Sequence, residues 1–342
     1  MRTDNKTSSH RCKQIHTDNK TSSHRCTRIH TDNKTSSVFI CVYLWLIPYL
    51  WLPYPWPIAY LWHPSTRLAA GQQAPNRPPI GGIDHLALRV TDIATARAFY
   101  RGVLGLAEEQ ASPGAVYRVG GRQRIVIEPG LRPDEDERLL HLAFATTNLD
   151  AVAERLRGAG FEPSSSDAPL CGGHVLRVRD PDGHTIEFVQ RDVRNPGGGP
   201  AAPAAPPLAV SSRLLHAGLT VQNADAADRF YKETLGFSEL WRGGRTDAEV
   251  DWINMRVPDG TDYLEYMLVR GPVDRRQRGV LHHVCLLVPD IQEAYESVLA
   301  RTPASGRGAM AAPSVGRNRR WQLNLYDPDG TRTELMEPHT MR

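Results

Sequence analysis

Four histidines, each on a short strand-like segment and each followed by a glutamate, are the residues of this sequence best suited to bind a metal ion. The four pairs are His85 with Glu128, His141 with Glu187, His216 with Glu265, and His283 with Glu334, and their members are 43 to 51 residues apart. A carboxylate on a buried strand is costly unless it is paired or binds a metal. Sets of imidazole and carboxylate ligands suit Zn, Ni, Fe(II) or Mn, with positions left open for a substrate.

The residues beside these histidines leave room for a ligand. Because successive residues of a strand face opposite sides, the residue two positions after each histidine shares its face. Those four residues are all small: Ala87, Ala143, Gly218 and Cys285. The same alternation selects His283 rather than its neighbour His282. Duplication of a structural histidine would explain the repetition, but it would not explain the buried-strand glutamates.

The histidines and glutamates mark four similar units, each predicted as a strand, a helix and about three strands. The histidine strands are 83–90, 139–146, 214–221 and 281–288; the helices are 94–106, 149–158, 224–237 and 291–300; the glutamate strands are 124–130, 184–190, 262–269 and 331–338. The first and third helices share a Phe-Tyr pair and stop at a glycine, as helices commonly do. Asp-Pro-Asp-Gly at 180–183 and 327–330 predicts a hairpin turn before the last strand.

The four units group into two predicted domains of an α+β fold. A segment rich in Pro, Gly and Ala, 193–210, is typical of a linker and separates a first domain at 80–192 from a second at 211–338. The charged segments 132–138 and 274–278 are predicted as shorter joins within each pair of units.

The first 75 residues are not expected to belong to these domains. Residues 1–37 repeat a polar 14-residue unit and are predicted to be disordered, and 38–75 is an apolar segment, uncharged over 38–62, followed by small residues. The second segment predicts an exported protein, periplasmic or secreted, or a membrane anchor through 38–62, although its four prolines oppose a spanning helix. A start assigned too far upstream would give the same pattern, and the protein would then be cytoplasmic.

Charge and cysteine content exclude two classes of protein. Residues 1–37 carry eight Lys and Arg against three Asp, so the remainder of the chain, with 33 against 35 acidic residues, is nearly neutral. A strongly basic nucleic-acid-binding domain is therefore not expected. The five cysteines are scattered and form no Cys-x-x-Cys motif, which opposes a disulfide scaffold or a cysteine zinc site.

The units resemble the βαβββ modules of the vicinal oxygen chelate superfamily, which includes glyoxalase I, extradiol dioxygenases and bleomycin-resistance-type binding proteins. The segments HLALRVTDIATARAFYRGVLGL (85–106) and HAGLTVQNADAADRFYKETLGF (216–237) are similar to the glyoxalase I signature. The resemblance implies that two modules form a half-open barrel with metal ligands on their first and last strands. It implies two metal sites, one formed by His85, Glu128, His141 and Glu187 and one by His216, Glu265, His283 and Glu334.

The resemblance implies a metal-dependent lyase or isomerase that acts on a small oxygenated substrate. The metal would polarise a carbonyl or enediolate oxygen, and one of the four glutamates would move a proton. An extradiol dioxygenase using His216, His283 and Glu334 is one alternative, and a non-catalytic ligand-binding protein is another. Four arginines either bind an acidic substrate or are solvated charges: Arg245, Arg317, Arg319 and Arg320. Two tryptophans, Trp252 and Trp321, either line the pockets or belong to the core.

Overall fold

The structure is a computed structural model that describes residues 77–109, 113–121, 123–167, 174–191, 208–308 and 310–341. The repeats at 1–37, the apolar segment 38–75 and nearly all of the linker 193–210 lie outside the described residues. Within the described part of the chain, no helix is both long and apolar enough to cross a membrane.

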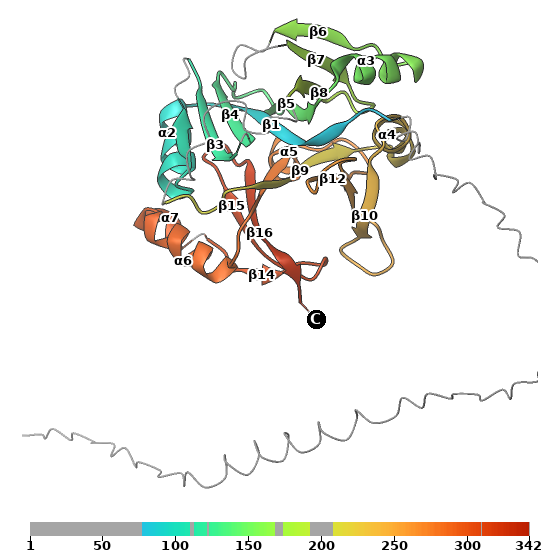
Figure 1. The fold of residues 1–342 in the computed structure, drawn as a ribbon. Coiled ribbons are helices and arrows are strands. Elements are labelled where there is room, and N and C mark those ends of the chain that lie inside the picture. The colour runs from blue at the N-terminus through green and yellow to red at the C-terminus, as the bar shows by residue number, and fades with distance from the viewer. Residues whose placement is uncertain are drawn as a thin grey trace, which may run out of the picture. The chain divides into compact units, whose positions relative to one another are not determined.

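All four predicted units are present, and each contains a first strand, a helical segment and three further strands (Figure 1). The first unit comprises β1 (Ile80–Val90), α2 (Ile93–Arg97), the π-helical η2 (Ala98–Val103), β2 (Ala107–Glu109), β3 (Ala115–Gly120) and β4 (Gln123–Pro129). The second comprises β5 (Leu139–Thr146), α3 (Leu149–Gly158), β6 (Ser164–Asp167), β7 (His174–Arg179) and β8 (Thr185–Gln190). We call these two units the N-terminal half.

The C-terminal half repeats this order. Its first unit comprises β9 (Leu214–Val221), α4 (Ala224–Asp228), the π-helical η3 (Arg229–Thr234), β10 (Ser238–Gly243), β11 (Trp252–Arg256) and β12 (Tyr263–Leu268). Its second comprises β13 (His283–Leu287), α6 (Ile291–Arg301), α7 (Ala304–Arg307), β14 (Ser314–Val315), β15 (Arg320–Tyr326) and β16 (Arg332–Thr340). The segment 274–278, predicted as a join, instead begins helix α5 (Arg275–Leu281), because Asp274 and Gln277 form a capping box at its N-terminus.

Each half forms one curled eight-stranded sheet, and the histidine strands occupy its centre. The strand orders are β2-β3-β4-β1-β5-β8-β7-β6 and β10-β11-β12-β9-β13-β16-β15-β14. The two histidine strands of a half pair antiparallel with each other, and each pairs in parallel with the last strand of its own unit. This arrangement confirms the predicted pairing of βαβββ units and brings two histidine strands and two glutamate strands together in each sheet.

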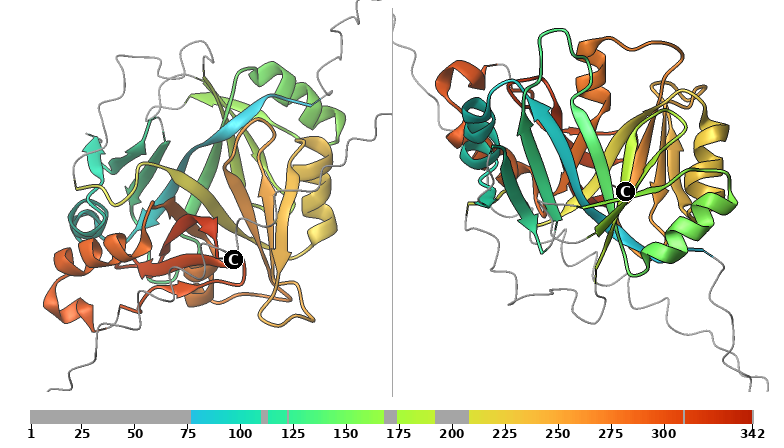
Figure 2. Two further views of the ribbon diagram at one scale, coloured as in Figure 1. Left: turned by 60° about the horizontal axis from the view of Figure 1, so that its bottom comes forward. Right: turned by 90° about the horizontal axis from the view of Figure 1, so that it is seen from above.

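The helices pack where the two halves meet, so the halves share one core. Helix α3 lies beside α4 at one end, and α2 lies near α6 and α7 at the other (Figures 1 and 2). The Phe144 ring contacts Phe237 at a centroid distance of 5.3 Å, and the Phe161 ring contacts Phe230 at 4.8 Å. The buried apolar residues of both sheets form one continuous cluster. The halves are therefore distinct sheets within a single packed body.

The repeated sequence motifs make matched contacts across this interface. The hydroxyl of Tyr100 donates to Asp327 at 3.0 Å, and the hydroxyl of Tyr231 donates to Asp180 at 2.9 Å. Both tyrosines come from the Phe-Tyr pairs and lie in the π-helical segments, while both aspartates begin the Asp-Pro-Asp-Gly turns. The fourth residue of each turn, Gly183 or Gly330, has a positive φ, as the predicted hairpin requires.

The burial of Asp327 predicts a pH dependence of stability. Burial raises the pKa of Asp327 from 3.8 to about 6, so the folded protein holds this proton more tightly than the unfolded chain. The stabilisation is fully present below pH 3.8 and is lost as the pH rises through 6. We expect Asp327→Asn to remove this loss, so that the variant gains up to about 3 kcal/mol relative to the native protein between pH 4 and 7.

Urea unfolding across that pH range measures this gain. Asp225→Asn is the matched control, because the side chain of Asp225 is exposed to solvent. Parallel pH profiles for the native protein and Asp327→Asn would contradict the expectation.

Candidate functional site

Four buried side chains converge in the C-terminal half: His216, Glu265, His283 and Glu334. The Nε2 atoms of the two histidines are 3.0 Å apart. Glu334 Oε2 lies 3.3 Å from His216 Nε2 and 3.6 Å from His283 Nε2, and Glu265 Oε2 lies 3.8 and 3.3 Å from the same two atoms. Four atoms that each lie ~2.0–2.2 Å from one ion would show separations of this size. The donor set therefore fits a divalent metal ion.

Strand register produces this convergence. Glu265 on β12 is paired with Gly218 on β9, Glu334 on β16 is paired with Cys285 on β13, and His283 is itself paired with Gly218. A Cβ on Gly218 would lie 2.1 Å from the His283 ring, so only glycine leaves room for that imidazole. The sequence predicted an open space beside Gly218, and in the structure the His283 ring fills that space.

The environment keeps these ligands in the charge states that metal binding requires. Burial lowers the pKa of His283 well below its usual value, and the nearby Arg332 and His216 lower it further, so this imidazole is neutral. Its Nδ1 donates to the carbonyl of Leu281 at 2.9 Å, which leaves the Nε2 lone pair facing toward the cluster. The guanidinium of Arg332 lies 2.9 Å from that Nε2, so an ion that binds here has to displace it. Burial alone would raise the pKa of Glu334, but the hydrogen bond with His216 and the charge of Arg332 hold it below its usual value.

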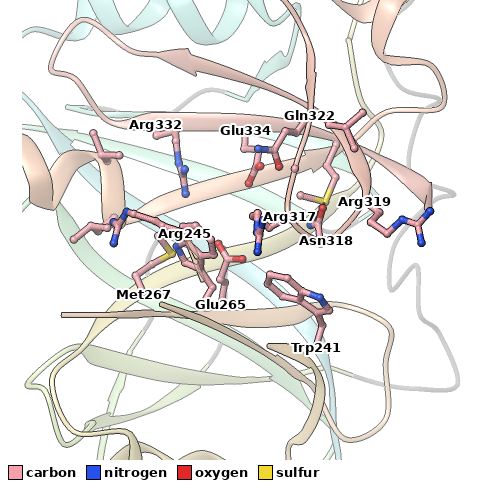
Figure 3. Close-up of a pocket in the computed structure, with 16 residues that line it drawn as sticks. Trp241, Arg245, Glu265, Met267, Arg317, Asn318, Arg319, Gln322, Arg332 and Glu334 are labelled. Atoms are coloured by element: carbon pink, nitrogen blue, oxygen red, sulfur yellow. Dashed lines mark hydrogen bonds between the residues drawn. The ribbon is translucent and has the colours of Figure 1, made fainter. Parts of the chain in front are cut away.

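A cavity of about 650 Å³ opens onto this cluster. Glu265 and Glu334 line it together with basic, polar and aromatic side chains; Arg317 and Arg332 lie near the two carboxylates, whereas Arg319 extends away from them (Figure 3). The lining includes Trp241, Arg245, Trp252, Met267, Arg317, Asn318, Arg319, Gln322 and Arg332. Guanidinium groups beside these four side chains are suited to a small substrate that carries negative charge, although Arg245 is already paired with Asp251 and Arg317 with Asp247.

The cavity tests the sequence predictions on arginine and tryptophan. Arg245, Arg317 and Arg319 line it as anticipated, and so does Trp252. Arg320 and Trp321 are not among the lining residues, and Trp321 packs against the apolar core instead. Several lining residues were not predicted, among them Arg332 on β16 and Trp241 on β10.

The N-terminal half holds a smaller cluster of three residues, His85, His141 and Glu187. The Nε2 atoms of the histidines are 3.0 Å apart, and Glu187 Oε2 lies 4.0 and 3.7 Å from them. The predicted fourth member, Glu128, lies outside this group. It is paired with Arg89, whereas Val126 is paired with Ala87 and takes the place that Glu265 has in the other half. Glu128 lies two residues further along β4 than the position equivalent to Glu265, so the structure does not bring this predicted ligand into the cluster.

In the N-terminal cluster a neighbouring arginine contacts the single carboxylate, whereas in the C-terminal cluster Arg332 contacts a histidine and leaves both carboxylates unpaired by any arginine of the described residues. The guanidinium of Arg177 donates to Glu187 Oε1 at 2.5 and 2.9 Å. Burial, together with the charges of His85 and Arg177, lowers the pKa of His141 to about 3. His85 Nδ1 faces Asp84 at 2.8 Å, which orients its Nε2 toward the cluster. Arg177 would compete with a cation for Glu187, so we expect weaker metal binding here than in the C-terminal half.

This difference between the halves predicts the metal affinities of three variants. Glu334→Gln and His216→Gln should each weaken Zn²⁺ or Ni²⁺ binding by at least ~100-fold, because loss of an outer partner alone costs 10–100-fold. Glu128→Gln should leave metal affinity unchanged, because this carboxylate is outside both clusters. Competition with a chromophoric chelator measures all three. A loss of affinity in Glu128→Gln equal to that in Glu334→Gln would overturn the register argument.

Comparison with known proteins agrees with this fold and these clusters. The chain matches the Glyoxalase/Bleomycin resistance protein/Dioxygenase superfamily over residues 82–188 and 213–335. It is 26% identical over 126 residues to a lactoylglutathione lyase of Salmonella typhimurium, an alignment covering 31% of this chain and 90% of that protein. It is 27% identical over 121 residues to a lactoylglutathione lyase of Haemophilus influenzae, with 31% and 90% covered.

Solved structures with the same fold include dioxygenases. The 2,3-dioxygenase LapB from Pseudomonas sp. KL28 has a TM-score of 0.58 at 20% identity, covering 76% of this chain and 93% of that one. An extradiol ring-cleaving dioxygenase from B. fuscum has a TM-score of 0.58 at 22% identity, covering 76% and 72%. Similarity at these identities establishes the fold alone. The sequence matches and the four βαβββ units together show that this chain belongs to the glyoxalase, bleomycin resistance protein and dioxygenase superfamily.

Proposed function

We propose that the protein is a metal-dependent lyase or isomerase of the glyoxalase type, with its active site in the C-terminal half. The observation that carries this proposal is the complete set of two imidazoles and two carboxylates at the base of an arginine-lined cavity. The similarity to lactoylglutathione lyases supports a thiol adduct of a 2-oxoaldehyde as the substrate class. A ligand-sequestering protein would have no use for a complete metal set.

The side chains of the site suggest a division of roles. A divalent ion held by His216, Glu265, His283 and Glu334 would act as a Lewis acid toward adjacent oxygens of the substrate. Glu265 and Glu334 both border the cavity, so either carboxylate can take the proton from the substrate carbon and return it to the neighbouring carbon. The arginines of the cavity would hold the negative charge of the thiol portion.

The turnover of a methylglyoxal–glutathione adduct tests this function. We expect activity in the Zn²⁺- or Ni²⁺-loaded protein and a fall in kcat of about 10²–10⁴-fold when the proton-transfer carboxylate is replaced. Glu265→Gln and Glu334→Gln are compared at a metal concentration high enough to load the weaker-binding variants, and the metal content of each is measured. The glutamate whose variant keeps the metal but loses turnover is the base.

Glu187→Gln is the matched control for that experiment, because it changes the equivalent residue of the N-terminal cluster. Turnover that survives both Glu265→Gln and Glu334→Gln would refute an active site in the C-terminal half.

The arginines provide a separate prediction on substrate binding. Arg319 borders the cavity and Arg320, its neighbour, does not. Because an exposed charge pair contributes ~0.2–1 kcal/mol, Arg319→Ala should raise KM for a carboxylate-bearing thiol adduct by up to about fivefold and leave kcat unchanged. Arg320→Ala should leave both unchanged. Steady-state kinetics distinguish the two, and equal effects would show that the cavity does not select for charge.

A ring-cleaving dioxygenase is the second candidate function. The types of ligand in the N-terminal cluster favour it. His85, His141 and Glu187 are two histidines and one carboxylate, the set that suits non-haem Fe(II) oxygenases. The ion pair between Arg177 and Glu187 opposes iron binding there. Oxygen uptake by the Fe(II)-loaded protein with a catechol would favour this candidate, and metal-dependent turnover of the thiol adduct without oxygen uptake would exclude it as the main activity.

A further inference from the structure

A third pair of histidines, outside both clusters, lies where the two halves meet. His184 follows the Asp-Pro-Asp-Gly turn of the N-terminal half, and His282 precedes β13 of the C-terminal half. Their Nε2 atoms are 3.2 Å apart, and the hydroxyl oxygen of Thr220 on β9 is 3.2 Å from the first and 2.9 Å from the second. All three side chains are buried.

This pair has the geometry of the two histidine pairs in the clusters already described. Its ring centroids are 5.0 Å apart at an interplanar angle of 81°. The corresponding values are 5.1 Å and 88° for His85 with His141, and 5.1 Å and 89° for His216 with His283. Two imidazole nitrogens that bind one ion at ~2.0–2.1 Å show a separation of this size.

The remaining nitrogens of this pair are held by carboxylates. His184 Nδ1 lies 2.8 Å from Asp180 Oδ2, and His282 Nδ1 lies 2.8 Å from Glu137 Oε1. An ionised carboxylate only accepts hydrogen bonds, so each Nδ1 carries the hydrogen and each Nε2 of a neutral imidazole is left with its lone pair. Metal-binding histidines commonly donate their second nitrogen to a carboxylate in this way.

When both imidazoles are neutral, the two lone pairs therefore face each other in the interior of the protein. Burial lowers the pKa of His184, but the hydrogen bond and charge of Asp180 raise it above its usual value, so a proton on its Nε2 competes with a cation for the same position. The single hydrogen of the Thr220 hydroxyl satisfies one Nε2 and leaves the other facing its partner. A proton on His184 or a metal cation between the two nitrogens resolves this conflict. The side chain of Glu137 is 38% exposed, so the cluster extends to the surface at one end.

The opposite end of the interface shows that packing does not require these histidines. There Thr331 occupies the position of His184 after the matching turn, and Leu140 occupies the position of His282 beside the cluster histidine. The turns themselves are alike, since the amides of His184 and Thr331 each donate to the first aspartate at 2.8 Å. The same interface thus forms once with the histidines and once without them.

We propose that His184, His282 and Thr220 form a third cation site, which binds a divalent transition-metal ion such as Zn²⁺ or Co²⁺ between the two halves. The imidazoles supply two ligands from different halves, the threonine hydroxyl supplies an oxygen, and water completes the coordination. The ion links the halves and carries no substrate, so its role is separate from the proposed lyase activity.

Metal stoichiometry tests the site. Full-length protein is refolded with excess Zn²⁺ or Co²⁺, dialysed and measured by elemental analysis. His184→Thr and His282→Leu use the residues found at the opposite end of the interface, so both should fold, and each should hold one ion fewer than the native protein. His339→Gln, an exposed histidine near the C-terminus, should hold as many ions as the native protein. Equal metal content in the native protein and His184→Thr would overturn the proposal.

Thermal unfolding provides the second readout. Added Zn²⁺ should raise the Tm of the native protein more than that of His184→Thr, because only a folded site gains binding free energy. The conservative Thr220→Val, which removes the hydroxyl and keeps the shape, should show an intermediate shift. In the Glu334→Gln background the loss of the third ion should persist, which separates this site from the C-terminal cluster. Identical Zn²⁺-dependent shifts in all variants would refute a metal between the halves.

Discussion

The parallel pairing between the first and last strand of each unit is the constraint on which both clusters depend. In three units this register sets a glutamate beside the residue two positions after the histidine, so the carboxylate and imidazole meet on one face of the sheet. A slip of one residue would send every carboxylate to the other face. A shift of two residues keeps the face but moves the side chain by ~6.6 Å, beyond the reach of a shared ion.

A shift of two residues in strand register explains which part of the site could be predicted from the sequence. The alternation of strand residues identified the four histidines, the small neighbours and three of the four glutamates. Glu128 also lies on the expected face, but its register is set by the turns and bulges of the first unit, which periodicity does not reveal. The strand pairs show that Val126 is the residue beside Ala87. The fold was predictable because it repeats four times, whereas Arg332 and the shared core depend on contacts between distant segments.

The two halves have diverged in chemistry while keeping one scaffold. The C-terminal half has the complete ligand set and a cavity with several arginines. The N-terminal half has a valine in place of one carboxylate and an arginine bound to the other. Because the Phe-Tyr and Asp-Pro-Asp-Gly motifs join the halves in the same way at both ends, the N-terminal half contributes to the packing that holds the C-terminal site, whatever ion it binds itself.

The absence of a side chain at Gly218 also accounts for the different exposure of the second histidine in each half. The equivalent residue in the N-terminal half is Ala87, which is paired with His141 as Gly218 is paired with His283. The side chain of His283 is fully enclosed, whereas that of His141 is 16% exposed. A difference of one methyl group thus coincides with a sealed imidazole in one sheet and a partly hydrated one in the other, so the two sites would offer an incoming ion unequal access to water.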